Sequence, residues 1–181
     1  MQFLLKAARV IDQISEWLGR LTFGLMLIMF ALGAYNAITR YLGQYIGRNL
    51  SSNIYIESQW YLFSLIFLLG AAYVLKYDAH VRVDIFYTRL SARGKAWVNL
   101  LGALFLLIPI CIVVIFYSLP AVVNSWNVLE QSSDPSGLPR YPLKTVIPVA
   151  FFLLGLQGVS EAIKQVAVLR GVTSNETEAS R

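Results

Sequence analysis

The chain has 181 residues, of which 57% are hydrophobic and only 14% are charged. Soluble domains carry about a quarter charged residues, so this composition excludes an ordinary soluble domain and favours an integral membrane protein. The net charge of +5 does not indicate nucleic-acid binding, because the lysines and arginines are confined to short segments between apolar runs.

The first segment, residues 1–19, has the pattern of an amphipathic helix. Apolar residues recur there at steps of three and four, and polar residues fall between them. Beside an apolar run, this pattern predicts a helix that lies in the plane of the membrane interface. Packing against a partner helix is the alternative. The apolar positions are Phe3, Leu4, Ala7, Val10, Ile11, Ile14, Trp17 and Leu18.

Four uncharged runs follow, at residues 21–39, 58–75, 96–129 and 145–160. A transmembrane helix needs about 17 to 25 predominantly apolar residues. We therefore predict a four-helix membrane domain at residues 20–168, with spans at about 21–40, 58–76, 96–126 and 145–165. The third run would reach roughly 50 Å as a helix, whereas the hydrocarbon core is about 30 Å thick. It must tilt, project or break, and Pro109 and Pro120 are candidate kinks.

The distribution of lysine and arginine predicts the side of the membrane that each segment faces. Eleven of these residues lie before the first run, between the second and third runs, or after the fourth run; four lie in the other two loops. Because positive charge is retained on the cytoplasmic side, we expect both termini in the cytoplasm, including a tail at residues 169–181. The first and third loops then face outward.

The residues needed for catalysis or metal binding are scarce. His80 is the only histidine, and Cys111, the only cysteine, lies in an apolar run, so no metal cluster and no nucleophile–base arrangement can be built. The acidic residues are placed at or beyond the span ends, whereas pumps and channels usually need an ionisable group at membrane depth. We therefore expect no enzyme and no cofactor. Buried polar residues such as Asn36 and Gln157 are expected to make helix–helix hydrogen bonds.

The loop at residues 76–95 has charges of both signs around its valines. If it is extended, His80, Arg82 and Asp84 share one face; if it is helical, Asp78 and Arg82 become neighbours. Either geometry brings Arg82 close to a carboxylate, and we expect Arg82 and Asp84 to be partly buried. An ordinary positive-inside loop is the alternative. Ser91 is a candidate N-cap for the third span.

The segment at residues 130–148 is rich in proline, which limits it to extended and turn conformations. Gly137 permits a tight turn within it. A rigid, non-helical loop is preorganised for contact with a partner, and a stiff connector is the alternative. Small residues in two spans also let helices approach closely, and we expect part of their faces to contact a partner. These small residues include Gly70, Gly155 and Gly158.

Residues 57–161 resemble the small membrane subunit of tripartite ATP-independent periplasmic (TRAP) transporters. The resemblance rests on ESQWYLFSLIFLLGAAYVL at the second span, on DAHVRVD directly after it, and on SGLPRYPLKTVIP, which runs into FFLLGLQG. These motifs are specific in combination, although none of them suffices alone. One departure is Ser58 beside Glu57, where many relatives carry a second acidic residue.

The resemblance implies a four-helix scaffold in the lipid bilayer of the bacterial inner membrane. Its partners would be a much larger membrane subunit, which holds the substrate and sodium sites, and a periplasmic binding protein that delivers the substrate, usually an organic acid. A self-sufficient small transporter or channel is the main alternative, and a membrane enzyme or its anchor is another. The residues expected at partner interfaces or in structural roles are Glu57, Gly70, His80, Arg82, Asp84, Gly137, Leu138, Pro139, Gly155 and Gly158.

Overall fold

The computed structural model describes residues 1–48, 50–79, 87 and 90–171, and within these residues it is all-helical. His80, Arg82 and Asp84, and with them the expectation of a partly buried pair, lie outside the described residues. The helices, in chain order, are α1 (Gln2–Ile46), α2 (Asn53–Lys76), α4 (Ala92–Gly102), the π-helix η1 (Ala103–Leu107), α5 (Ile108–Asn127) and α6 (Tyr141–Leu169).

The prediction of four transmembrane helices is confirmed. Four helices are long and apolar enough to cross a membrane, at Gln2–Ile46, Asn53–Lys76, Ala92–Asn127 and Tyr141–Leu169. Each helix is longer than the uncharged run from which it was predicted. The helical hydrogen bonding continues past the run, because charged residues are tolerated in the turns that lie beyond the hydrocarbon.

The first helix differs from the prediction of a separate N-terminal element. α1 continues without a break through residue 19 and includes 45 residues, which corresponds to roughly 67 Å. Ala8, Ser15 and Leu18 are buried against the other helices, whereas Phe3 and Trp17 point outward and are 81% and 64% exposed. The separate amphipathic helix at residues 1–19 is therefore not confirmed. The segment extends the first span, with small and polar side chains on its inner face.

The second helix begins five residues earlier than its predicted span. Ser52 provides the N-cap, because its side chain accepts a hydrogen bond from the backbone N–H of Ile54. Ser91 caps α4 in the same way, by accepting from the N–H of Gly94 at 3.2 Å, and this N-cap prediction is confirmed.

The long third helix bends without breaking. α4, η1 and α5 follow one another directly, and the π turn of η1 ends just before Pro109, which occupies the first turn of α5. Proline cannot donate the hydrogen bond of a regular α-helix, and a wider turn accommodates both the missing donor and the ring. Pro120 lies inside α5, which continues to Asn127.

The prediction of a non-helical segment through residue 148 is wrong at its C-terminal end. α6 begins at Tyr141 and includes both Pro142 and Pro148. Pro142 lies in the first turn, where a backbone N–H has no intrahelical partner in any case. Pro148 is buried inside the helix, where neighbouring helices support the interrupted hydrogen bonding.

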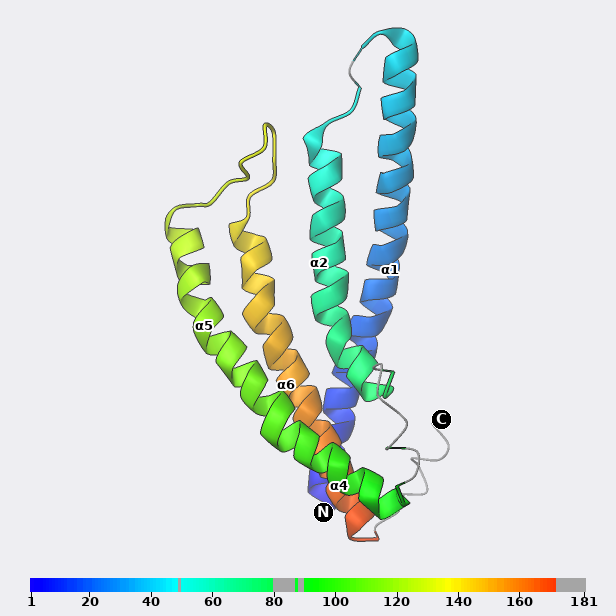
Figure 1. The fold of residues 1–181 in the computed structure, drawn as a ribbon, viewed down its shortest axis with the longest axis vertical. Helices are drawn as coiled ribbons and strands as arrows, with labels where there is room; N and C mark the ends of the chain where they lie inside the picture. The colour runs from blue at the N-terminus through cyan, green and yellow to red at the C-terminus, as the bar shows by residue number, and fades with distance from the viewer. Residues whose placement is uncertain (49, 80–86, 88–89, 172–181) are drawn as a thin grey trace.

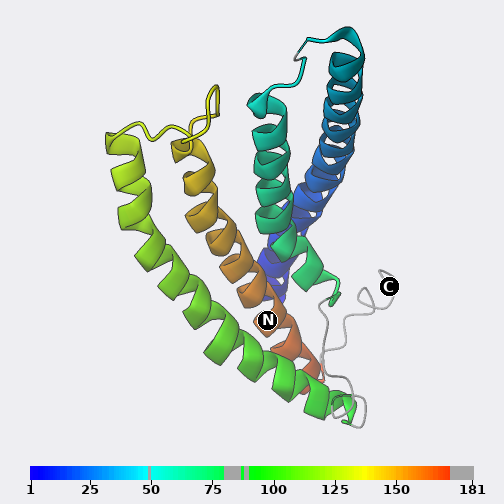
Figure 2. The same cartoon turned by 45° about the horizontal axis from the view of Figure 1, so that its top comes forward.

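The helices form two pairs, α1 with α2 and α5 with α6, which lie close at the N-terminal end of α1 and diverge toward the opposite end (Figures 1 and 2). α6 is the central helix, because it contacts α1, α2, α4, η1 and α5. The segment at residues 128–140 joins α5 to α6 at the diverging end and reaches across to α2.

Candidate functional site

The third loop is held on α2 by a group of residues that we call the loop cluster: Glu57, Tyr61, Ser132, Gly137, Leu138 and Pro139. Glu57 is buried, and its carboxylate accepts hydrogen bonds from the Ser132 hydroxyl and from the backbone N–H of Leu138. A carboxylate that receives two donors from a loop fixes that loop more firmly than neutral hydrogen bonds do. Four of the predicted residues, Glu57, Gly137, Leu138 and Pro139, are thus brought together.

Tyr61 is a member of the loop cluster that the sequence analysis missed. Its hydroxyl lies 2.7 Å from the carbonyl oxygen of Pro139 and 3.2 Å from that of Leu138, so it donates to this backbone. Tyr61 follows Glu57 by four residues, so the two side chains share one face of α2. That spacing was the available signal. Asn53, at the start of α2, adds a hydrogen bond of 3.2 Å to the carbonyl of Pro135.

Gly137 is required for close approach. A Cβ atom at this position would lie 2.6 Å from the Ser132 hydroxyl and 2.8 Å from a Glu57 carboxylate oxygen, which is closer than real Cβ contacts. The residue of this turn that has a left-handed backbone conformation is Ser136, with a φ of 59°, and not Gly137. The turn predicted at Gly137 therefore exists, but the glycine is present for a steric reason.

A second carboxylate, Glu130, ties the same loop to α5 and α6. It accepts hydrogen bonds from Lys144 and from Ser125, the latter at 2.6 Å. The hydrogen bond from Lys144, followed by that from Ser125, lowers the pKa of Glu130 below its ordinary value. The ionised form therefore favours the docked loop at neutral pH, and this contribution is lost as the pH falls through the lowered pKa. The Trp126 indole N–H also donates to Thr145 at 2.8 Å.

The opposite end of the helices contains what we call the N-terminal cluster: Asp12, Ser15, Gln157, Ser160 and Lys164. Asp12 pairs with Lys164 at 2.7 Å and accepts from Gln157 and Ser160, each at 2.9 Å. Ser15 donates to the Gln157 side-chain oxygen at 2.7 Å. Gln157 and Ser160 are both 0% exposed, so this network fastens α1 to α6 in the interior. The helix–helix hydrogen bonding predicted for Gln157 is confirmed.

Glu16 makes the matching contact to α2. Its carboxylate pairs with Lys76 at 2.7 Å, accepts from the Tyr77 hydroxyl at 2.6 Å and lies 3.5 Å from Arg20. The acidic residues of the N-terminal segment therefore face the other helices. Sequence periodicity identified the amphipathic pattern but did not predict these partners on α2 and α6.

The predicted glycine positions lie at contacts within the chain. A Cβ added at Gly155 would lie 3.5 Å from the Cys111 Cβ, and a Cβ added at Gly158 would lie only 2.8 Å from a Leu107 methyl carbon. A Cβ added at Gly70 of α2 would lie 4.0 Å from the Thr22 hydroxyl of α1, which is an ordinary contact. Gly155 and Gly158 thus allow α6 to approach α5 and η1, and contact with a partner at all three positions stays a prediction.

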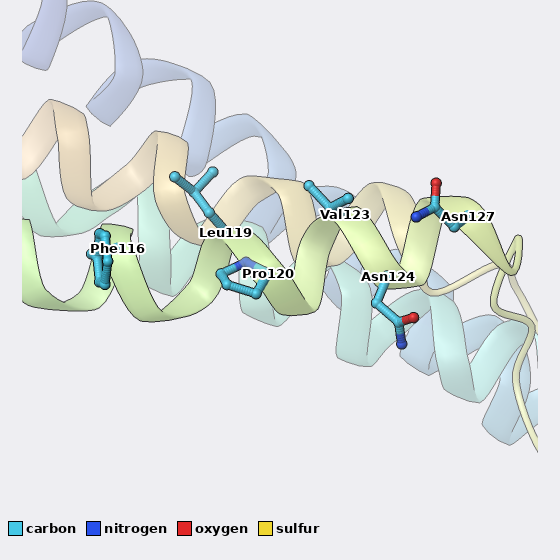
Figure 3. Close-up of a pocket in the computed structure, with 6 residues that line it drawn as sticks. All are labelled: Phe116, Leu119, Pro120, Val123, Asn124 and Asn127. Atoms are coloured by element: carbon cyan, nitrogen blue, oxygen red, sulfur yellow. The ribbon is translucent and has the colours of Figure 1, made fainter.

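The described residues contain no group of three or more His, Cys, Asp or Glu side chains that could hold a metal ion. A shallow groove lies on α5 around Pro120 (Figure 3). The residues that line it are contributed by this one helix, and none of them is ionisable: Phe116, Leu119, Pro120, Val123, Asn124 and Asn127. This groove has no charged group with which to bind an ionic solute or an ion.

Comparison with known proteins identifies one family. The family model described as "Tripartite ATP-independent periplasmic transporters, DctQ component" matches residues 29–168. This range includes all of the loop cluster, the whole of α2, and α6 to within one residue of its end. No curated protein matches the chain, and no solved structure matches it.

Proposed function

Because this chain belongs to the family of DctQ components of tripartite ATP-independent periplasmic transporters, we propose that it is the non-catalytic small permease subunit of such a transporter. In this role it supports the large membrane subunit of a sodium-coupled importer that receives organic acids from a periplasmic binding protein. The protein lies in the bacterial inner membrane. The match to the family over residues 29–168 is the observation that carries the proposal.

The distribution of charged groups supports a scaffold role. Asp12, Glu16 and Glu130 are engaged in ion pairs at the helix ends, and Glu57 is occupied by donors of the third loop. A transport site usually presents ionisable groups to a solute pathway. Here these carboxylates fasten helices and loops to one another, which suits a subunit that holds its shape while a partner moves.

The proposal predicts that transport requires the large subunit. The chain is reconstituted into liposomes alone, and in parallel together with its large subunit, with a sodium gradient and the binding protein supplied to both. We expect uptake of a labelled organic acid only in the second preparation. Uptake by the chain alone would contradict the scaffold role and favour a self-sufficient transporter. Failure of the two chains to copurify would contradict the subunit assignment.

The positive-inside distribution predicts that both termini face the cytoplasm. Reporter fusions after Arg48 and after Ser136 should show periplasmic activity, and a fusion after Asp78 should show cytoplasmic activity. All three sites lie between helices, so the preceding helix remains whole in each fusion. A cytoplasmic signal after Ser136 would overturn this topology.

A further inference from the structure

The seven-residue repeat of α1 separates its buried side chains from its exposed ones. We label the seven successive positions of the repeat a to g, so that residue 7 is an a position and residue 10 is a d position. Between residues 5 and 43, every b and e residue is buried or partly buried against the other helices. Every a and d residue of α1 is exposed, apart from the partly exposed Ala7. A repeat of 3.5 residues per turn, carried over the whole helix, is the signature of left-handed helix packing.

The exposed a and d residues form a continuous apolar stripe, which we call the α1 seam. No charged or amide side chain interrupts its thirteen positions. Two of its d positions near the middle of the helix are small, and a Cβ added at Gly24 would meet nothing within 4 Å. The α1 seam consists of Phe3, Ala7, Val10, Ile14, Trp17, Leu21, Gly24, Ile28, Ala31, Tyr35, Ile38, Leu42 and Tyr45.

Lipid does not account for the whole seam. α1 is roughly 67 Å long, more than twice the hydrocarbon thickness of about 30 Å. The helix is continuous, so its N-terminal part cannot turn to lie in the membrane plane (Figure 1). In this part the exposed c and g positions are polar, as contact with water or headgroups requires, whereas the a and d positions are apolar. The polar set is Gln2, Lys6, Arg9, Gln13 and Arg20.

We infer that the α1 seam is the docking surface for a membrane-crossing helix of the large subunit. This inference rests on the function proposed above. A second helix with the same repeat would cover the seam both within the lipid and beyond it. Gly24 and Ala31 let its backbone approach closely. Lys6 flanks the seam at an exposed g position, so we expect the partner helix to carry a carboxylate at that end.

Photocrosslinking in the copurified complex tests this surface. A photoreactive amino acid is placed at the seam positions Val10, Ile28 or Ile38, and the off-seam c positions Phe23, Phe30 and Ala37 serve as controls. All six side chains are exposed on α1, and Ile28 and Ile38 match the controls in their access to lipid, whereas Val10 tests the part of the seam beyond the hydrocarbon. We expect crosslinks to the large subunit from the seam at about tenfold or greater yield than from the controls. Equal yields from both sets, or crosslinks from the seam only to lipid or to a second copy of this chain, would overturn the inference.

A substitution tests the same surface without a probe. Gly24→Leu combined with Ala31→Leu fills the two small d positions of the seam, which are exposed on α1, whereas Ala37→Leu adds one leucine at an exposed position off the seam. The double variant should reduce the copurified large subunit at least about tenfold, and Ala37→Leu should leave it within about twofold of wild type. Undiminished copurification of the double variant would overturn the inference that the α1 seam is the docking surface, but not the proposed function. Absence of a complex with the wild-type chain would overturn the proposed function itself.

Discussion

Replacing Asp12 with alanine is expected to destabilise the protein more than any other single removal of a charge among its described residues. The Asp12 carboxylate pairs with Lys164 and accepts from Gln157 and Ser160. Its removal leaves the partly buried Lys164 ammonium group with Glu161 at 3.8 Å as its remaining carboxylate. It also takes the acceptor from the buried Gln157 amide and leaves the Ser160 hydroxyl with the Ala8 carbonyl at 3.2 Å. Breaking a buried ion pair costs roughly 3–5 kcal/mol, and since this pair is a fifth to a quarter exposed, we expect about 3 kcal/mol.

The measurement is thermal unfolding of the purified chain in detergent, where Asp12→Ala should lower the unfolding temperature by roughly 5–10 °C. Gln13→Ala is the matched control, because it removes the exposed neighbouring polar side chain and should have almost no effect. Asp12→Asn keeps one acceptor oxygen and should fall between the two. Indistinguishable unfolding of Asp12→Ala and Gln13→Ala would show that the N-terminal cluster adds nothing to stability.

Gly137→Ala is expected to abolish most transport by the full complex while membrane insertion stays normal. The added methyl group would lie too close to Ser132 and Glu57, so the loop must leave α2 or the Glu57 hydrogen bonds must break. Overpacking of this kind costs roughly 1–3 kcal/mol, concentrated in one loop. We expect uptake to fall at least about tenfold, because a displaced loop no longer presents its preorganised surface to a partner.

The control for this change is Ser136→Ala, one residue earlier on the exposed part of the loop, which should transport normally. Glu57→Ala removes the other half of the contact and should give the same defect as Gly137→Ala. The double variant should be no worse than either single one, because both act on one contact. Additive losses would mean that Glu57 and Gly137 act separately, and normal uptake by Gly137→Ala would reduce the loop to a connector.

The four spans could be predicted from the sequence because continuous apolar runs report directly on the solvent that surrounds a helix. The helix ends could not be read in the same way. α2 begins at a serine cap, five residues before its charge-free run, and α6 begins four residues before its own run and contains Pro148 in its interior, which an isolated helix would not tolerate. Both are decided by contacts and caps that a count of charges does not register.

The functional groups were found with uneven success. Glu57 and the residues 137–139 were singled out, but their contact joins positions 81 residues apart, and no local pattern specifies such a pairing. The N-terminal segment shows the converse case. Its periodicity was evident, yet its orientation depended on Lys76 and Lys164, which α2 and α6 place beside Glu16 and Asp12. An amphipathic pattern identifies two faces, and only the partners decide which face is inside.

The hydrogen bonds between α1 and α6 have a consequence for biogenesis. They join residues 142 to 152 positions apart, so the polar side chains of α1 are synthesised long before the partners on α6 that satisfy them. Until that moment, Asp12 and Ser15 have no partners on α6. A nascent or truncated chain without α6 therefore displays an unsatisfied polar face beside its first span, which marks it as unfinished for membrane chaperones and proteases.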